Sequence, residues 1–176
     1  VLVGAALTLP STDNFMTSAV LDSVNRFLYA ATYLNTNSPP PALIVQIRAP
    51  VGSSPSRVGA LVLNDTAMAS GQIVSPLTSA AIDLGASVAY FRTQVIQAYN
   101  PEPNKIIKIQ LPLAGSSTIF AATKFVPSLL FYLPYGLSVY SSFLLVTSSA
   151  LLSRIYLANF TLADSVALVD PNTNGP

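Results

Sequence analysis

The alternation of apolar and polar positions along the chain predicts mostly β-strands. Strand candidates recur at a steady spacing, and each is bounded by Pro, Gly, Asn or Ser. The alternation is clearest in Lys105 to Leu111, where Ile107, Ile109 and Leu111 share one face. The other candidates are Ala42 to Ala49, Arg57 to Leu63, Ser87 to Gln97, Ser128 to Leu133, Val139 to Thr147 and Leu151 to Leu162. No internal repeat is evident in this pattern.

Residues 20–33 are the segment that best fits a helix. Apolar residues recur there at spacings of three and four, and the polar residues lie largely off that stripe. The prolines Pro39, Pro40 and Pro41 follow and favour an extended chain. A second helix could run from Leu77 to Leu84 and continue into Ser87 to Gln97. However, Gly85 and several β-branched and aromatic residues favour a strand over Ser87 to Gln97.

Many short strands with Pro and Gly turns, together with one helix, predict an all-β fold. We expect an antiparallel jelly-roll sandwich formed by residues 11–170, with a tail at 171–176. Residues 1–10 read as an arm that can add to the edge of a neighbour's sheet or of its own. The apolar side of that arm consists of Val1, Val3, Ala5, Leu7 and Leu9.

The stretch from Phe125 to Ser153 carries no charge and is long enough to cross a bilayer as a helix. Its interior prolines and many hydroxyl groups argue against a helix. Two buried strands separated by a turn at Pro134 to Gly136 fit better, so we expect no membrane span. No secretory signal pattern is visible at the start of the printed sequence.

The composition favours a protein that associates with copies of itself. The 176 residues are 51% hydrophobic and only 9% charged, and the net charge is +1. This size predicts one domain, and the hydrophobic content excludes general disorder. A surface with so few charges needs cover, which we expect neighbouring copies to provide. The small net charge argues against a concentrated cationic face for nucleic acid.

The side chains offer little for catalysis. The sequence contains no Cys and no His, so we expect no enzyme activity, no metal centre and no cofactor. An enzyme or a sugar-binding module with a sandwich fold is an alternative function that these side chains support less well than a structural role. Calcium could bind acidic side chains at subunit contacts, although solvated turns explain these better. The acidic residues considered for calcium are Asp65, Asp83, Asp164 and Asp170. Two N-glycosylation patterns begin at Asn64 and Asn159, and they could carry sugar if the protein is extracellular.

The order of elements resembles a known family. The strings VLDSVNRFLYAATY and ALIVQIRAP, followed by KIIKIQLPL, PSLLFYLPYG and SSALLSRIYLANFTL, carry the resemblance. Over roughly residues 10 to 165 the chain resembles the shell domain of small icosahedral RNA plant virus coat proteins, most closely those of the tymovirus type. The resemblance implies an eight-stranded jelly roll that assembles into a closed shell around RNA.

Two assemblies are therefore expected. In the first, the chain is a viral coat protein in a virion, with many copies of itself as partners and weak direct contacts to RNA. The basic candidates for RNA phosphate contacts are Arg26, Arg48, Arg57, Lys105 and Lys108. In the second, the chain is a subunit of an extracellular filament, such as an archaeal thread or pilus, and its arm fills a groove in the next subunit.

Overall fold

In the computed structural model, the residues described are 6–13, 16–32, 42–63, 77–93, 106–111, 122–125, 134–148, 151–158 and 162–167. Within these ranges the regular structure is β-strand, apart from one short 3₁₀ turn, η1, at Ser11–Asp13. All of the strand pairs are antiparallel. The predicted all-β, antiparallel class is confirmed.

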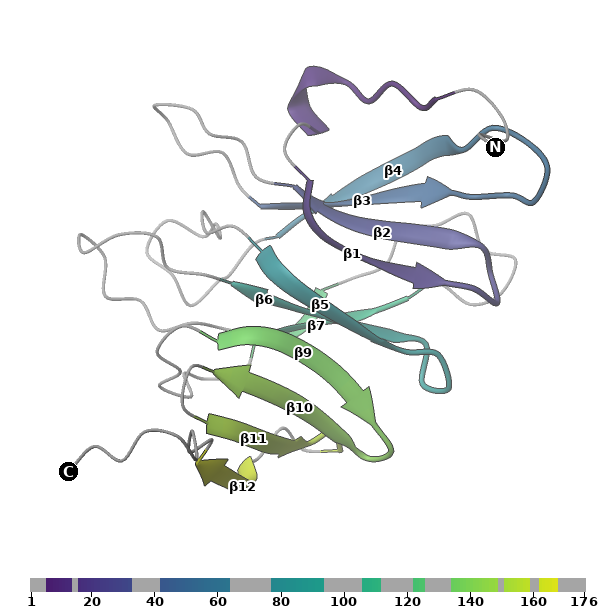
Figure 1. Cartoon of the computed structure of the whole chain (residues 1–176). Coiled ribbons are helices and arrows are strands. Elements are labelled where there is room, and N and C mark those ends of the chain that lie inside the picture. Colours follow the sequence, from purple (N-terminus) through teal and green to yellow (C-terminus); the bar gives the residue numbers. More distant parts are fainter. Residues whose placement is uncertain are drawn as a thin grey trace, which may run out of the picture.

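The described strands form three sheets of four strands each (Figure 1). The first sheet contains β1 (Met16–Asp22), β2 (Phe27–Thr32), β3 (Leu43–Arg48) and β4 (Ser56–Val62). The second contains β5 (Leu77–Asp83), β6 (Val88–Thr93), β7 (Ile106–Gln110) and β8 (Ala122–Phe125). The third contains β9 (Pro134–Tyr140), β10 (Phe143–Ser148), β11 (Leu151–Tyr156) and β12 (Leu162–Ala167).

Neighbouring strands within each described sheet are consecutive in the chain. A jelly roll instead brings strands distant in sequence together through long Greek-key connections. The sheets pack face to face, as in a sandwich, so the coarse architecture agrees with the prediction. The jelly-roll strand order is not confirmed.

The helix predicted over residues 20–33 is wrong. Residues 20–32 form the end of β1, a turn, and β2, and Tyr33 lies outside the described residues. A carboxylate oxygen of Asp22 accepts hydrogen bonds from the backbone N–H groups of Val24 and Asn25, at 3.1 and 2.9 Å. Arg26 then adopts a φ of 60°, which ends any right-handed helix. Val20 of β1 and Phe27 of β2 consequently lie on the same face of the sheet. Their separation in the sequence also fits the apolar side of a helix, which explains the wrong prediction.

The turn predicted at Pro134 to Gly136 is also wrong, because these residues lie within β9. The chain reverses at Ser141 and Ser142, and Ser141 has a φ of 54°. The predicted strand Val139 to Thr147 is therefore divided between β9 and β10. The prediction for Ser128 to Leu133 lies outside the described residues.

The remaining strand predictions are largely confirmed. The strands β3, β4, β6 and β7 fall within the expected ranges or begin one residue earlier. Residues 77–83 form β5 and not the helical alternative. The segment Leu151 to Leu162, expected as one strand, contains β11 and the first residue of β12.

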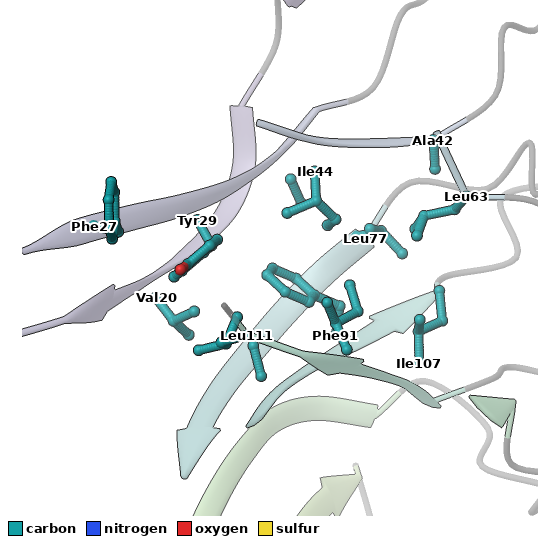
Figure 2. Packing of buried hydrophobic residues seen from close by; sticks show 13 residues of the cluster. Val20, Phe27, Tyr29, Ala42, Ile44, Leu63, Leu77, Phe91, Ile107 and Leu111 are labelled. Carbon is teal, nitrogen blue, oxygen red and sulfur yellow. The ribbon is translucent and has the colours of Figure 1, made fainter. Parts of the chain in front are cut away.

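Two apolar clusters hold the three sheets together. The first lies between the first and second sheets and contains Phe27, Tyr29 and Ile44 from the first sheet and Leu77 and Phe91 from the second (Figure 2). The second lies between the second and third sheets, and its members are Ala81, Val88, Tyr90, Ile106, Leu144, Val146 and Ile155. The second sheet is thus covered on both faces, which explains why β6 is buried along its whole length.

The first two sheets are repeats of one unit, contrary to the prediction of no internal repeat. Thr17, Ser18, Ala19, Asp22, Tyr29 and Thr32 recur at one constant spacing as Thr78, Ser79, Ala80, Asp83, Tyr90 and Thr93. A backbone hydrogen bond recurs in all three sheets, from the N–H that follows the third strand to the carbonyl that precedes the second. The pairs are Ala49 with Arg26 (2.9 Å), Leu111 with Ser87 (2.8 Å) and Leu157 with Ser142 (2.9 Å).

Candidate functional site

The sheets contact one another mainly through their first strands, β1, β5 and β9 (Figure 1). The hydroxyls of Thr17 and Ser18 both donate to the carbonyl oxygen of Leu77, at 2.7 Å. In the repeated position, the hydroxyl oxygen of Ser79 accepts a hydrogen bond from the backbone N–H of Leu137, at 2.9 Å. Ser18 of β1 and Ser79 of β5 therefore each bond to the backbone of the following first strand.

The third sheet presents an outer face, which is the face turned away from the second sheet. Leu137 and Val139 join the cluster between the sheets, so Ser138 and Tyr140 of the same strand point outwards. We define the outer face of the third sheet as Ser138, Tyr140, Phe143, Leu145, Arg154 and Tyr156. The side chain of Tyr140 is 70% exposed. This face combines apolar and aromatic groups that contact solvent.

A cluster of aromatic and charged groups fixes the geometry of this outer face. The rings of Phe143 and Tyr156 are 4.9 Å apart between centroids, and the Arg154 guanidinium lies 5.2 Å from the centroid of Phe143. Arg154 also forms an exposed ion pair with Asp164, and its Nε donates to Oδ1 at 2.6 Å. The hydrogen bond from Arg154 holds the pKa of Asp164 below its ordinary value.

The outer face of the third sheet corresponds to faces that are buried in the other two sheets. Leu145, paired with Ser138, takes the position that Tyr29 and Tyr90 hold in the first and second sheets. Both tyrosines are buried by the next sheet, whereas Leu145 is only half-buried. The third sheet therefore exposes a surface that its two equivalents cover.

The predicted basic residues that the structure describes come from two sheets and do not form one patch. Arg26 and Arg48 are exposed and lie at the same end of the first sheet, because Arg48 pairs with Phe27, the residue that follows Arg26. Arg57, in β4, forms an ion pair with Asp13, with an Nε to Oδ2 distance of 2.5 Å. Lys108 lies in the second sheet, and Lys105 is outside the described residues. Two exposed arginines are a small contact surface for a polyanion.

Buried polar groups recur in the first two sheets. Burial raises the pKa of Tyr29 to about 12 and that of Tyr90 to about 12, and the nearby Asp22 and Asp83 act in the same direction. Burial lowers the pKa of Arg92 to about 10, so this side chain stays charged at neutral pH. Arg92 donates to the Thr78 hydroxyl at 3.2 Å. These groups lie between sheets, and we assign them to the fold.

The part of the chain that the structure describes contains no group of three or more acidic, His or Cys side chains that could hold a metal ion. Asp83 accepts a hydrogen bond from the N–H of Ala86 at 3.0 Å and so closes a turn. Asp65, Asp170, Asn64 and Asn159 lie outside the described residues. Among the helices of the described residues, none is long and apolar enough to cross a membrane.

The described part of the N-terminal arm lies along its own chain. Leu7 and Leu9 are half-buried, while Ala6, Thr8 and Pro10 are exposed. Residues 6–10 form no strand, and Val1, Val3 and Ala5 are outside the described residues. In Figure 1 this segment, which includes η1, lies on the side of the first sheet away from the second sheet, and Asp13 binds Arg57 of β4.

Sequence reasoning missed the outer face of the third sheet. Its residues come from β9, β10 and β11, and the wrong turn at residues 134–136 hid the first of these strands. The repeat of Thr-Ser-Ala and Asp in the first two sheets was the available signal. It indicates that residues 17–32 and 78–93 adopt the same structure.

Comparisons with known proteins assign no family. No protein-family model matches the chain, and no curated protein matches it. Among solved structures, the chain is similar to the WD40 domain of Pan2 from Neurospora crassa, with a TM-score of 0.43 and 11% sequence identity. The match covers 93% of this chain and 55% of that one, so the chain spans little more than half of its length.

Proposed function

We propose that this protein is a structural subunit that acts by associating with copies of itself, with no reaction to catalyse. The observation that carries the proposal is the outer face of the third sheet, where Tyr140, Tyr156 and Leu145 occupy a surface whose equivalents are covered in the other sheets. The low content of charged residues supports the same conclusion, since such a surface favours association.

One form of the proposal is a viral coat protein that forms a closed shell around RNA in a virion. It is supported by the resemblance to small icosahedral RNA virus coats and by the scarcity of charge. Direct contacts to RNA would be few, because Arg57 is already paired with Asp13 and leaves Arg26 and Arg48 as the exposed basic candidates on the first sheet. The salt dependence of RNA affinity is then shallow.

The second form is an extracellular filament. The head-to-tail order of the sheets favours it, because the second sheet offers one face to the first sheet and the other face to the third. Contacts of this heterologous kind form rings when the rotation closes and open fibres when it does not.

The test is the state of the purified protein. Analytical ultracentrifugation over a range of protein concentrations should show particles larger than one chain. Negative-stain electron microscopy then distinguishes closed shells from fibres. A protein that sediments as a single chain at millimolar concentration contradicts both forms.

A further inference from the structure

We propose that the outer face of the third sheet binds the outer face of the first sheet of a second copy, head to tail. This inference rests on the proposed self-association and names the two surfaces that meet. The outer face of the first sheet is the face turned away from the second sheet, and we define it by Ala19, Leu21, Leu28, Ala30, Val45 and Ile47.

The three sheets contain equivalent positions, which strand pairing identifies. Val20, Ala81 and Ser138 each pair with the third residue of the following strand. Val20 lies in the cluster between the first and second sheets, and Ala81 lies in the cluster between the second and third. Ser138 is the next member of this series and is exposed. The series therefore predicts that a further sheet lies against Ser138.

The opposite surface follows the same rule. Ala19, Ala80 and Leu137 each pair with the fourth residue of the following strand. Ala80 packs against the sheet before it, and so does Leu137. Ala19 is exposed, and Leu21 on the same face is 52% exposed. No sheet formed by the described residues lies against this face of the first sheet.

Part of this surface is covered within the single chain, and the part on β1 is open. The N-terminal segment binds at β4 through the ion pair of Asp13 with Arg57, and Ala30 of β2 and Val45 and Ile47 of β3 are buried. The exposed residues lie on β1, which is the strand used for contacts between sheets. A second copy can thus approach β1 with its β9 while the N-terminal segment stays in place.

The occupant is a second copy because the contact continues one already made twice within the chain. The described strands form three four-stranded sheets that contact one another mainly through their first strands, and a second copy in this position extends the same arrangement. Gly136 stands where Ser18 and Ser79 make their hydrogen bonds between sheets, since each pairs with the fifth residue of the next strand. The contact between copies lacks that hydrogen bond and should be weaker than those within a chain.

The test uses one charged substitution on each face, Ala19→Glu and Ser138→Glu. Both side chains are exposed in the single chain, so neither change buries a charge in the fold. Val51→Glu is the matched control, because Val51 is 80% exposed in the β3–β4 turn and lies on neither face. Circular dichroism checks that all variants fold.

The expected result is that Ala19→Glu and Ser138→Glu each weaken self-association at least about 100-fold, because a carboxylate would be buried without a partner. The Val51→Glu protein associates like the wild type. An equal mixture of the two face variants should form a one-to-one dimer and nothing larger, since the Ala19→Glu protein keeps an intact third sheet and the Ser138→Glu protein keeps an intact first sheet. Sedimentation velocity resolves these species.

Other outcomes overturn the inference in distinguishable ways. If the wild type associates and both face variants associate equally well, the two faces are not the interface, although self-association stands. If the mixture stays monomeric, the contact is not head to tail. A wild type that is monomeric at every concentration overturns the proposed function as well.

Discussion

The hydroxyl oxygen of Ser79 accepts a hydrogen bond from the backbone N–H of Leu137, and this bond joins the second sheet to the third. Ser18 holds the equivalent place in the first sheet, and its hydroxyl donates to the carbonyl oxygen of Leu77. The hydroxyl of Thr17 donates to that same oxygen. Both contacts between sheets therefore use a serine hydroxyl at the same position, as a donor in the first contact and as an acceptor in the second. Only the first contact has a second hydroxyl donor.

This difference predicts unequal effects of two serine substitutions. Ser79→Ala removes the partner of a partly buried N–H and should lower the free energy of unfolding by about 1–2 kcal/mol. Ser18→Ala should cost less than about 1 kcal/mol, because Thr17 still bonds to the carbonyl of Leu77. Urea denaturation followed by circular dichroism measures both. Equal losses would show that the second donor contributes nothing.

The aspartates that close the first turn of each repeat give a second prediction. Asp22 is buried and accepts hydrogen bonds from the backbone N–H groups of Val24 and Asn25 and from the side chain of Asn25. Asp83 accepts from the N–H of Ala86. Asp22→Ala should therefore destabilise by about 2 kcal/mol and Asp83→Ala by about 1 kcal/mol.

Asp22→Asn is the control for this prediction, because an amide oxygen can still accept from the turn. Thermal unfolding should place this variant closer to the wild type than Asp22→Ala. The prediction fails if the asparagine and alanine variants unfold at the same temperature.

Tyr29 gives a prediction about high pH. Burial raises its pKa to about 12 in the folded protein, against 10.0 ordinarily. Between pH 10 and 12 the unfolded chain therefore loses a proton that the folded chain keeps, and stability falls as pH rises. Below pH 10 both states hold the proton, so the group adds no pH dependence there.

The measurement compares wild type with Tyr29→Phe by urea unfolding at pH 8, 10 and 11.5. The difference at pH 8 reflects the lost hydrogen bond with Gln46. From pH 10 to 11.5 the wild type should lose up to about 2 kcal/mol more than the variant. Tyr90 adds a slope of the same sign to both proteins, so the difference isolates Tyr29. Parallel curves would mean that Tyr29 has an ordinary pKa.

The ion pair between Asp13 and Arg57 should hold the N-terminal segment on the first sheet. Asp13 is buried, and Arg57 is half-exposed. Arg57→Gln should increase hydrogen exchange at the backbone of Asp13, whose N–H bonds to the carbonyl of Pro10. Exchange in β6 should not change, since that strand lies in the second sheet. Unchanged exchange at Asp13 would show that apolar contacts hold the segment without the ion pair.

The sequence identified most strands but not how they combine. Segments such as Ile106–Gln110 alternate visibly or carry β-formers between turn residues, so local preference was sufficient. Residues 20–33 misled because Val20 and Phe27 lie on one sheet face at a spacing that also fits a helix. The decisive interaction there is the Asp22 carboxylate with the turn backbone, which apolar periodicity does not detect.

The candidate surface was harder to foresee than the strands. Tyr140 and Phe143 are close in sequence, but they share a face only because the chain reverses at Ser141. Tyr156 joins them from β11 through strand pairing. Such a surface depends on the register of three strands, and a one-residue error in any turn moves its members to opposite faces.

In each sheet, the residue before the second strand accepts a backbone hydrogen bond from the N–H of the residue after the third strand. The accepting carbonyls belong to Arg26, Ser87 and Ser142. Each of these hydrogen bonds lies within one sheet and does not involve the neighbouring sheets. A chain built in this way can gain or lose a whole sheet by duplication or deletion without new turn chemistry. Its length can then vary during evolution in steps of one sheet, while the surfaces at the two ends keep their form.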